Sequence, residues 1–80
     1  MTSEDIQDIV IRTVAEQFMV DVDEVTMDTN FYNDLHADSL DYVELIMELE
    51  EDFGMDIGDE EGENVETVRD IVELLEHVLL

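Results

Sequence analysis

The placement of glycine and proline is the feature that most constrains the fold of this chain. Its 80 residues contain no proline, and all three glycines lie between Gly54 and Gly62. Proline and glycine are the residues that most destabilise a helix interior, so the first 53 residues are free to form long helices. No segment alternates apolar and polar residues with a period of two, and strands are therefore not expected.

Three segments repeat apolar residues at the three- and four-residue spacing of an amphipathic helix. This spacing predicts helices over residues 3–19, over residues 39–53, and from about Thr67 to near the end of the chain. Gly54 is suited to end the second helix in a left-handed conformation. A further short helix is expected around residues 59–61.

The remaining long segment, residues 21–38, mixes isolated apolar residues with turn-forming Asp, Thr and Asn. We expect Val22 and Val25 to mark a short turn, and Phe31 and Leu35 to anchor the rest to the core. The sequence thus predicts an all-α fold, a small bundle of three main helices plus one short helix with a long first loop. At this length, residues 1–80 are expected to form a single domain.

The charge of the chain is strongly negative. Twenty-five acidic residues face only Arg12 and Arg69, which gives a net charge of −23. Such a field repels nucleic acid and anionic membranes, attracts basic protein surfaces and favours a monomer. An apolar content of 45% nevertheless argues against a disordered acidic tail. We expect salt or magnesium to stabilise the fold by screening this charge.

Several classes of site and location are disfavoured by composition. The chain has no cysteine, which excludes disulfides, thiolate nucleophiles and zinc–thiolate sites. No segment matches a calcium-binding EF-hand loop, so no specific metal site is expected. No apolar run approaches the roughly 20 residues of a membrane span, and the acidic N-terminus does not resemble a targeting peptide. A cytoplasmic location is therefore expected.

Ser39 is the candidate site residue, because it lies where a loop meets the second predicted helix. A serine nucleophile needs a base and donors for an oxyanion. Only His36 and His77 could supply a base, and no G-x-S-x-G motif surrounds the serine, so no catalytic residue is assigned. The pair Asp38-Ser39 suits a helix cap, and a helix N-terminus favours an attached phosphate. Ser39 is thus better placed to be modified by another protein than to attack a substrate.

The second predicted helix carries two apolar faces. One fits a core stripe, whereas Leu40, Val43 and Met47 lie on a partly different face that acidic residues border. This second face is either ordinary core or a docking surface for basic, partly apolar partners.

The run Asp34-Leu-His-Ala-Asp-Ser39-Leu-Asp-x-Val43-Glu44-Leu-x-Met47-x-Leu49-Glu50-Glu51-x-Phe53 resembles the acyl carrier proteins of type II fatty acid and polyketide synthesis. The resemblance covers nearly the whole chain. It implies that a phosphopantetheinyl transferase attaches 4′-phosphopantetheine to Ser39, with the flanking Asp38 and Leu40 as further cofactor-binding residues. The terminal thiol of this arm would carry acyl groups as thioesters, so the protein would be a carrier and not an enzyme.

The resemblance also implies two further sets of residues. Acyl-transferring, condensing and reducing enzymes with basic docking surfaces would contact Asp38, Leu40, Asp41, Val43, Glu44, Met47, Glu50 and Glu51. An acyl chain would be sheltered in the bundle by Phe31, Leu45, Leu49, Val65 and Ile71.

The chain departs from the family pattern at several positions. His36 stands where glycine is usual, and histidine carries a cost if the loop requires a positive φ there. Glu48 replaces a small residue on the second helix, and Gly58 replaces a common proline. An aminoacyl or peptidyl carrier, another specialised carrier, and an unmodified acidic interaction module remain alternatives, and the length of the cargo is left open.

Overall fold

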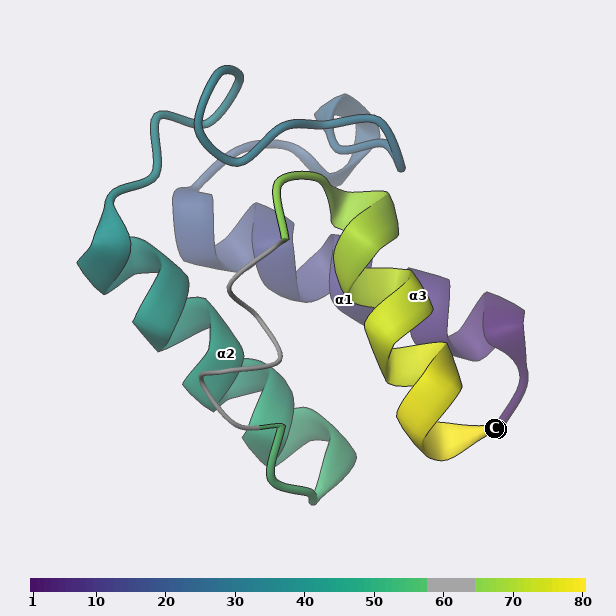
Figure 1. Ribbon diagram of the computed structural model, residues 1–80. Helices are drawn as coiled ribbons and strands as arrows, with labels where there is room; N and C mark the ends of the chain where they lie inside the picture. Colours follow the sequence, from purple (N-terminus) through teal and green to yellow (C-terminus); the bar gives the residue numbers. More distant parts are fainter. Residues whose placement is uncertain (58–64) are drawn as a thin grey trace.

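A computed structural model describes residues 1–57 and 65–80 and has the expected all-α architecture (Figure 1). It contains α1 (Ser3–Phe18), a short 3₁₀ turn η1 (Val22–Glu24), α2 (Ser39–Phe53) and α3 (Val68–Leu79). In these two ranges the only β-type pairing is an isolated bridge between Asn30 and Thr67. The short helix expected around residues 59–61 lies outside the described residues.

All three helices begin with the same local device, a reciprocal capping box. The side chain of the cap residue accepts a hydrogen bond from the backbone amide of the third residue of the helix. The carboxylate of this third residue accepts a hydrogen bond from the backbone amide of the cap residue. The pairs are Thr2 with Asp5, Asp38 with Asp41, and Thr67 with Asp70. At the other end of α2, Gly54 adopts φ 63° and terminates the helix as expected.

The core forms where α1 packs against both α2 and α3. Its largest fully buried side chains come from all three helices and from the long loop, namely Phe31, Ile6, Leu45, Leu49, Ile71, Leu75, Val10, Val14, Val68 and Val72. No helix within the described ranges is long and apolar enough to cross a membrane.

Phe31 anchors the long loop, as its isolated position in the sequence predicted. It is fully buried, and its ring lies 6.2 Å from that of Phe18 and 6.4 Å from that of Tyr42, centroid to centroid. The loop is thereby fastened to the end of α1 and to the first turn of α2. Leu35, the second predicted anchor, is partly buried against the same core.

The loop is also fastened to the start of α3. The amide of Phe31 donates to the carbonyl of Glu66 over 2.9 Å, and the amide of Val68 donates to Thr29 over 3.0 Å. Arg69 adds an ion pair of 3.2 Å with Asp28. These contacts join the segment that leads to Ser39 to the start of α3.

Candidate functional site

Ser39 is the first residue of α2, and its side chain is exposed at one end of the bundle. Asp38 precedes it in an extended conformation and accepts a hydrogen bond of 2.8 Å from the amide of Asp41. Asp41 in turn accepts one of 3.1 Å from the amide of Asp38. Because Asp38 performs the capping, the Ser39 hydroxyl is left without a hydrogen-bond partner in the described part of the chain.

A compact turn positions the backbone just before Ser39. The side-chain oxygen of Asn30 accepts from the amides of Tyr32 and Asn33, each over 2.9 Å. The amide of Asn30 donates to the carboxylate of Asp34 over 2.8 Å. The turn closes where the amide of Ala37 donates to the carbonyl of Phe31 over 2.8 Å.

His36 lies in this turn with φ 55°, a left-handed conformation that costs a residue with a side chain. The expectation that a histidine at this position carries a backbone cost is therefore met. Its side chain is exposed, and between residues 1–57 and 65–80 no hydrogen bond joins it to Ser39. His77 lies in the last turn of α3. Neither histidine is arranged as the base of a serine nucleophile.

The face of α2 that the sequence left ambiguous is exposed. Leu40, Val43 and Met47 are 64%, 43% and 59% exposed, so they do not belong to the core. Glu44 and Glu51 are exposed beside them. An exposed apolar stripe with acidic borders favours the docking interpretation over the core interpretation.

Three other acids assigned to partner contact, Asp38, Asp41 and Glu50, are held by hydrogen bonds within the chain. Asp41 belongs to the capping box of α2. A carboxylate oxygen of Glu50 accepts a hydrogen bond of 2.9 Å from the amide of Ile57, which ties the segment after α2 back onto the helix. The sequence could not reveal this second contact, because it depends on where the chain goes after Gly54.

The residues expected to shelter an acyl chain do come together. Phe31, Leu45, Leu49, Val65 and Ile71 are all buried, with exposed fractions of 5% or less, in one core cluster. In this conformation they pack as ordinary core side chains.

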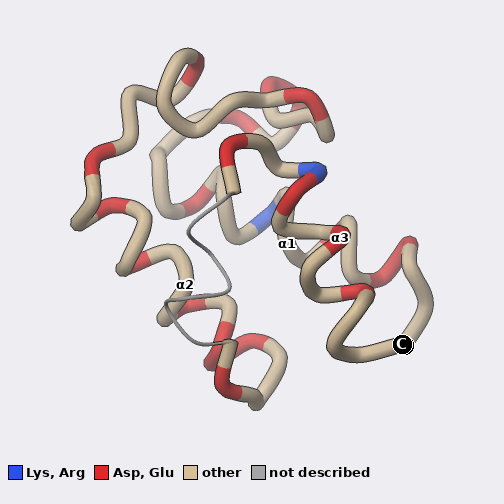
Figure 2. Tube along the Cα trace, in the orientation of Figure 1, with Lys and Arg blue, Asp and Glu red and all other residues tan. Residues whose placement is uncertain are grey.

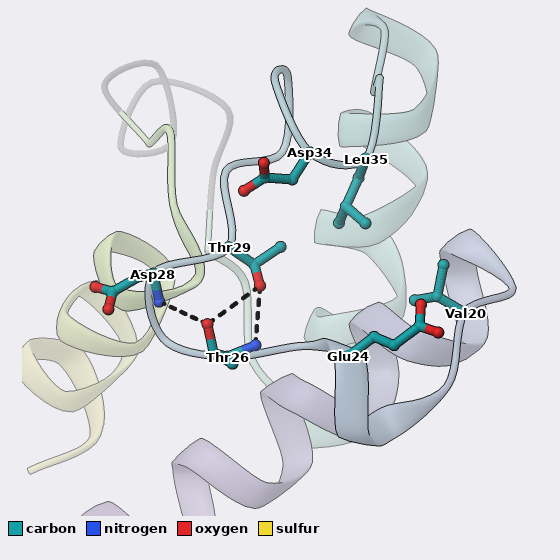
Figure 3. Close-up of a pocket in the computed structure, with 7 residues that line it drawn as sticks. All are labelled: Val20, Glu24, Thr26, Asp28, Thr29, Asp34 and Leu35. Carbon is teal, nitrogen blue, oxygen red and sulfur yellow. Dashed lines mark hydrogen bonds between the residues drawn. The ribbon is translucent and has the colours of Figure 1, made fainter.

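A hollow of about 400 Å³ lies elsewhere, under the long loop (Figure 3). Its wall contains two hydroxyls that are already engaged, since the amide of Thr26 donates to Thr29 over 2.9 Å and the amide of Asp28 donates to Thr26 over 3.3 Å. The full lining is Val20, Glu24, Thr26, Asp28, Thr29, Asp34 and Leu35. Within the described ranges, no three carboxylate or imidazole side chains are grouped so that they could hold a metal ion.

Tyr42 is the residue near the site that the sequence reasoning missed. It lies one turn after Ser39, and its ring meets that of Phe31 nearly edge-on, at an interplanar angle of 79°. Burial raises the pKa of its hydroxyl to about 12, with smaller contributions from Tyr32 and Asp70. Tyr42 is three residues from both Ser39 and the buried Leu45, and this spacing places it on the same side of the helix as both. That pattern in the sequence could have revealed it.

Electrostatically, the region around Ser39 is acidic. Acids lie on all three helices, whereas the two arginines lie on α1 and at the start of α3 (Figure 2). Helix α2 carries acids and no basic residue. The surface beside Ser39 therefore suits a basic partner.

Comparison with known proteins defines the family. Residues 8–75 match the profile of a family described as "Phosphopantetheine attachment site". The chain is 45% identical over 75 residues to the acyl carrier protein of Lactobacillus johnsonii, with 94% of each chain covered. It is 47% identical over 72 residues to the acyl carrier protein of Lactobacillus acidophilus, with 90% of each chain covered.

The helical fold and the matched profile together define a carrier that uses phosphopantetheine as its cofactor, rather than an enzyme. More specifically, the chain belongs to the acyl carrier protein family. The predictions of fold class, carrier function and cofactor are thereby confirmed.

Proposed function

We propose that Ser39 is the residue that bears 4′-phosphopantetheine. The single observation that carries this assignment is the exposed Ser39 hydroxyl at the start of α2, which lacks a partner among the described residues while Asp38 caps the helix. Amide hydrogens and the positive end of the dipole at a helix N-terminus favour an attached phosphate.

Attachment requires a separate phosphopantetheinyl transferase, because neither His36 nor His77 is arranged as a base for Ser39. The Ser39 oxygen would form an ester bond to the β-phosphorus of coenzyme A. The pyrophosphate bond would break, adenosine 3′,5′-bisphosphate would leave, and the hydroxyl proton would pass to the transferase or to solvent. When bound, the group supplies a terminal thiol, which the cysteine-free chain itself lacks, and this thiol holds an acyl group as a thioester.

The chain's own residues position the site for this role. Asp38 and Asp41 hold the first turn of α2, and the turn around Asn30 holds the preceding loop. Ser39 thus projects from a defined backbone between Asp38 and Leu40. The carboxylates of Asp38 and Asp41 would repel a phosphate, so their part in the site is to cap the helix.

Partner enzymes would dock on the surface of α2. The exposed Leu40, Val43 and Met47 offer apolar contact, while Glu44 and Glu51 offer charge to a basic surface. Asp38, Asp41 and Glu50 belong to the same proposed contact set, and they also stabilise the two ends of the helix. The expected partners are a phosphopantetheinyl transferase and the acyl-transferring, condensing and reducing enzymes of fatty acid or related lipid synthesis.

The cargo is proposed to be an acyl chain, because both relatives are named acyl carrier proteins. It would enter the core among Phe31, Leu45, Leu49, Val65 and Ile71, which must separate to admit it since all five are buried. Operation as one domain, as a monomer and in the cytoplasm remains a prediction.

The assignment is tested by incubating the protein with coenzyme A, magnesium and a broad-specificity phosphopantetheinyl transferase. Mass spectrometry should show a gain of one phosphopantetheine group on the wild type and none on Ser39→Ala. Ser3→Ala, which changes a serine at the start of α1, is the matched control and should still be modified. An unmodified wild type, with a transferase active on another carrier, would instead indicate an acidic interaction module.

A further inference from the structure

A phosphate attached to Ser39 would lie among acidic side chains. Three carboxylates lie close to the serine in the sequence, those of Asp34, Asp38 and Asp41. Their charges would oppose that of the phosphate. Between residues 30 and 53, His36 is the only side chain that can become positively charged. Both arginines lie outside this segment (Figure 2), and Arg69 is already paired with Asp28. His36 is therefore the one candidate counter-charge on this part of the chain.

The imidazole of His36 is available for this role. It is exposed, and it makes no hydrogen bond or ion pair with any residue in the ranges 1–57 and 65–80. The carboxylates on either side of it are bonded to backbone amides instead. Asp34 accepts from the amide of Asn30, whereas Asp38 and Asp41 accept from each other's amides. The histidine thus has no anionic partner until one is attached nearby.

The turn fixes the backbone of His36 on both sides. Its neighbours Leu35 and Ala37 are partly buried against the core. The amide of Leu35 donates to the carbonyl of Asn30 over 3.3 Å, and that of Ala37 donates to the carbonyl of Phe31 over 2.8 Å. Because its neighbours are held in this way, His36 keeps the strained φ of 55° while its own side chain stays exposed.

Ser39 lies within reach of this imidazole. The serine is three residues further along the chain, so the two Cα atoms are at most about 11 Å apart. Both side chains are exposed, and an imidazole and a serine-linked phosphate each extend several ångströms from the backbone. The two groups can therefore meet across this span. Strained backbone conformations are concentrated at functional sites, which agrees with a role for the side chain at this position.

We propose that the protonated imidazole of His36 pairs with the phosphate of phosphopantetheine on Ser39 and thereby positions the start of the arm. His36 is a positioning residue, because it acts on the orientation of the arm and not on the thioester. A phosphodiester keeps its single charge across neutral pH, whereas an imidazole changes its charge there. The contact is therefore strengthened as the pH falls. This inference rests on the proposed attachment at Ser39.

The first test compares the loaded protein with the unloaded protein by nuclear magnetic resonance of the two imidazole rings. Loading should move the titration midpoint of His36 to higher pH by about 0.5 units, because a nearby anion favours the protonated form. His77, in the last turn of α3, is the internal control and should move by less than about 0.1 units. Equal movement of the two rings, or no movement of His36, would overturn the proposal.

A second readout follows the phosphate itself. The phosphorus-31 chemical shift of the loaded wild type should change between about pH 5 and 8 with the same midpoint as His36. His36→Gln keeps a side chain on the strained backbone but removes the titrating group, so it should abolish this change. The matched variant His77→Gln should retain it. An unaltered transition in His36→Gln would contradict the contact.

Mass spectrometry of the wild type and of Ser39→Ala separates the two ways in which the inference can fail. A wild type that is not loaded contradicts the carrier assignment and, with it, the contact. A wild type that is loaded at Ser39 but whose phosphorus signal is independent of pH contradicts the role of His36 alone.

Discussion

The hydroxyl of Thr13 donates a hydrogen bond of 2.6 Å to a carboxylate oxygen of Asp52, joining the middle of α1 to the last turn of α2. Thr13 is buried and Asp52 is exposed, so the bond lies at the edge of the core. Hydrogen bonds to charged acceptors are shorter and stronger than neutral ones. This bond therefore helps to set the register in which α1 lies along α2.

Replacement of Thr13 by the nearly isosteric valine should lower the free energy of unfolding by about 1 kcal/mol. The cost stays modest because Asp52 can recover hydration at the surface. Urea denaturation measures the change. In an Asp52→Ala background the same replacement should cost much less, and an equal cost in both backgrounds would contradict a contribution from this bond.

His36→Gly should stabilise the protein. Glycine removes the strain that a side chain causes in the left-handed conformation, but its greater entropy in the unfolded chain offsets part of this effect. The free energy of unfolding should therefore rise by about 0.5–1 kcal/mol. The exposed His36 side chain has little packing to lose. Thermal and urea unfolding measure the gain.

His36→Ala is the control for backbone strain, because alanine keeps the Cβ atom while removing the imidazole. If alanine stabilised the protein as much as glycine, the gain would come from loss of the imidazole and not from relief of strain at φ 55°.

Ionisation of the Tyr42 hydroxyl should destabilise the protein at alkaline pH. Its pKa is raised from 10.0 to about 12 in the folded protein, mainly by burial. A raised pKa contributes stability that is complete below pH 10 and is lost as the pH rises toward 12. The free energy of unfolding should therefore fall more steeply across this window in the wild type than in Tyr42→Phe.

Urea unfolding at several pH values from 9 to 12 measures that slope. Tyr32→Phe removes an exposed phenol and should retain the steep slope of the wild type. Identical slopes for Tyr42→Phe and the wild type would rule out a stabilising effect of burial on the neutral phenol.

The excess of acids predicts stabilisation by salt. With a net charge of −23 and only the Arg69–Asp28 ion pair found among residues 1–57 and 65–80, the folded chain repels itself. An increase from about 10 to 150 mM sodium chloride shortens the screening length from roughly 30 to 8 Å. The melting midpoint should rise by about 5 °C, which corresponds to roughly 1 kcal/mol.

Calorimetry measures the midpoint, and choline chloride serves as the control for general screening. Millimolar magnesium should also raise the midpoint. No rise with any of the three salts would mean that self-repulsion does not limit stability.

Features encoded locally could be predicted from the sequence. The three main helices follow from apolar spacing and from cap residues a few positions away, and Gly54 ends α2 for the same local reason. Phe31 was recognisable as an anchor because it is a large apolar residue within a polar loop. The proposal that Ser39 bears phosphopantetheine came from its motif and from the family resemblance.

Features that depend on the tertiary arrangement could not be predicted. The pairing of Thr29 with Val68 brings together segments far apart in the sequence. The choice of Asp38 rather than Ser39 as the capping side chain depends on backbone geometry. The bond from Ile57 to Glu50 likewise requires the path of the folded chain.

The capping box of α2 has a mechanical consequence. Because Asp38 and Asp41 hold the backbone on both sides of Ser39, the Cα atom of the serine is a fixed point from which an attached group would extend. A flexible arm there would reach any accessible point within its extended length. A partner that grips α2 would thereby set the distance from this fixed point to its own catalytic centre, without having to hold the arm itself.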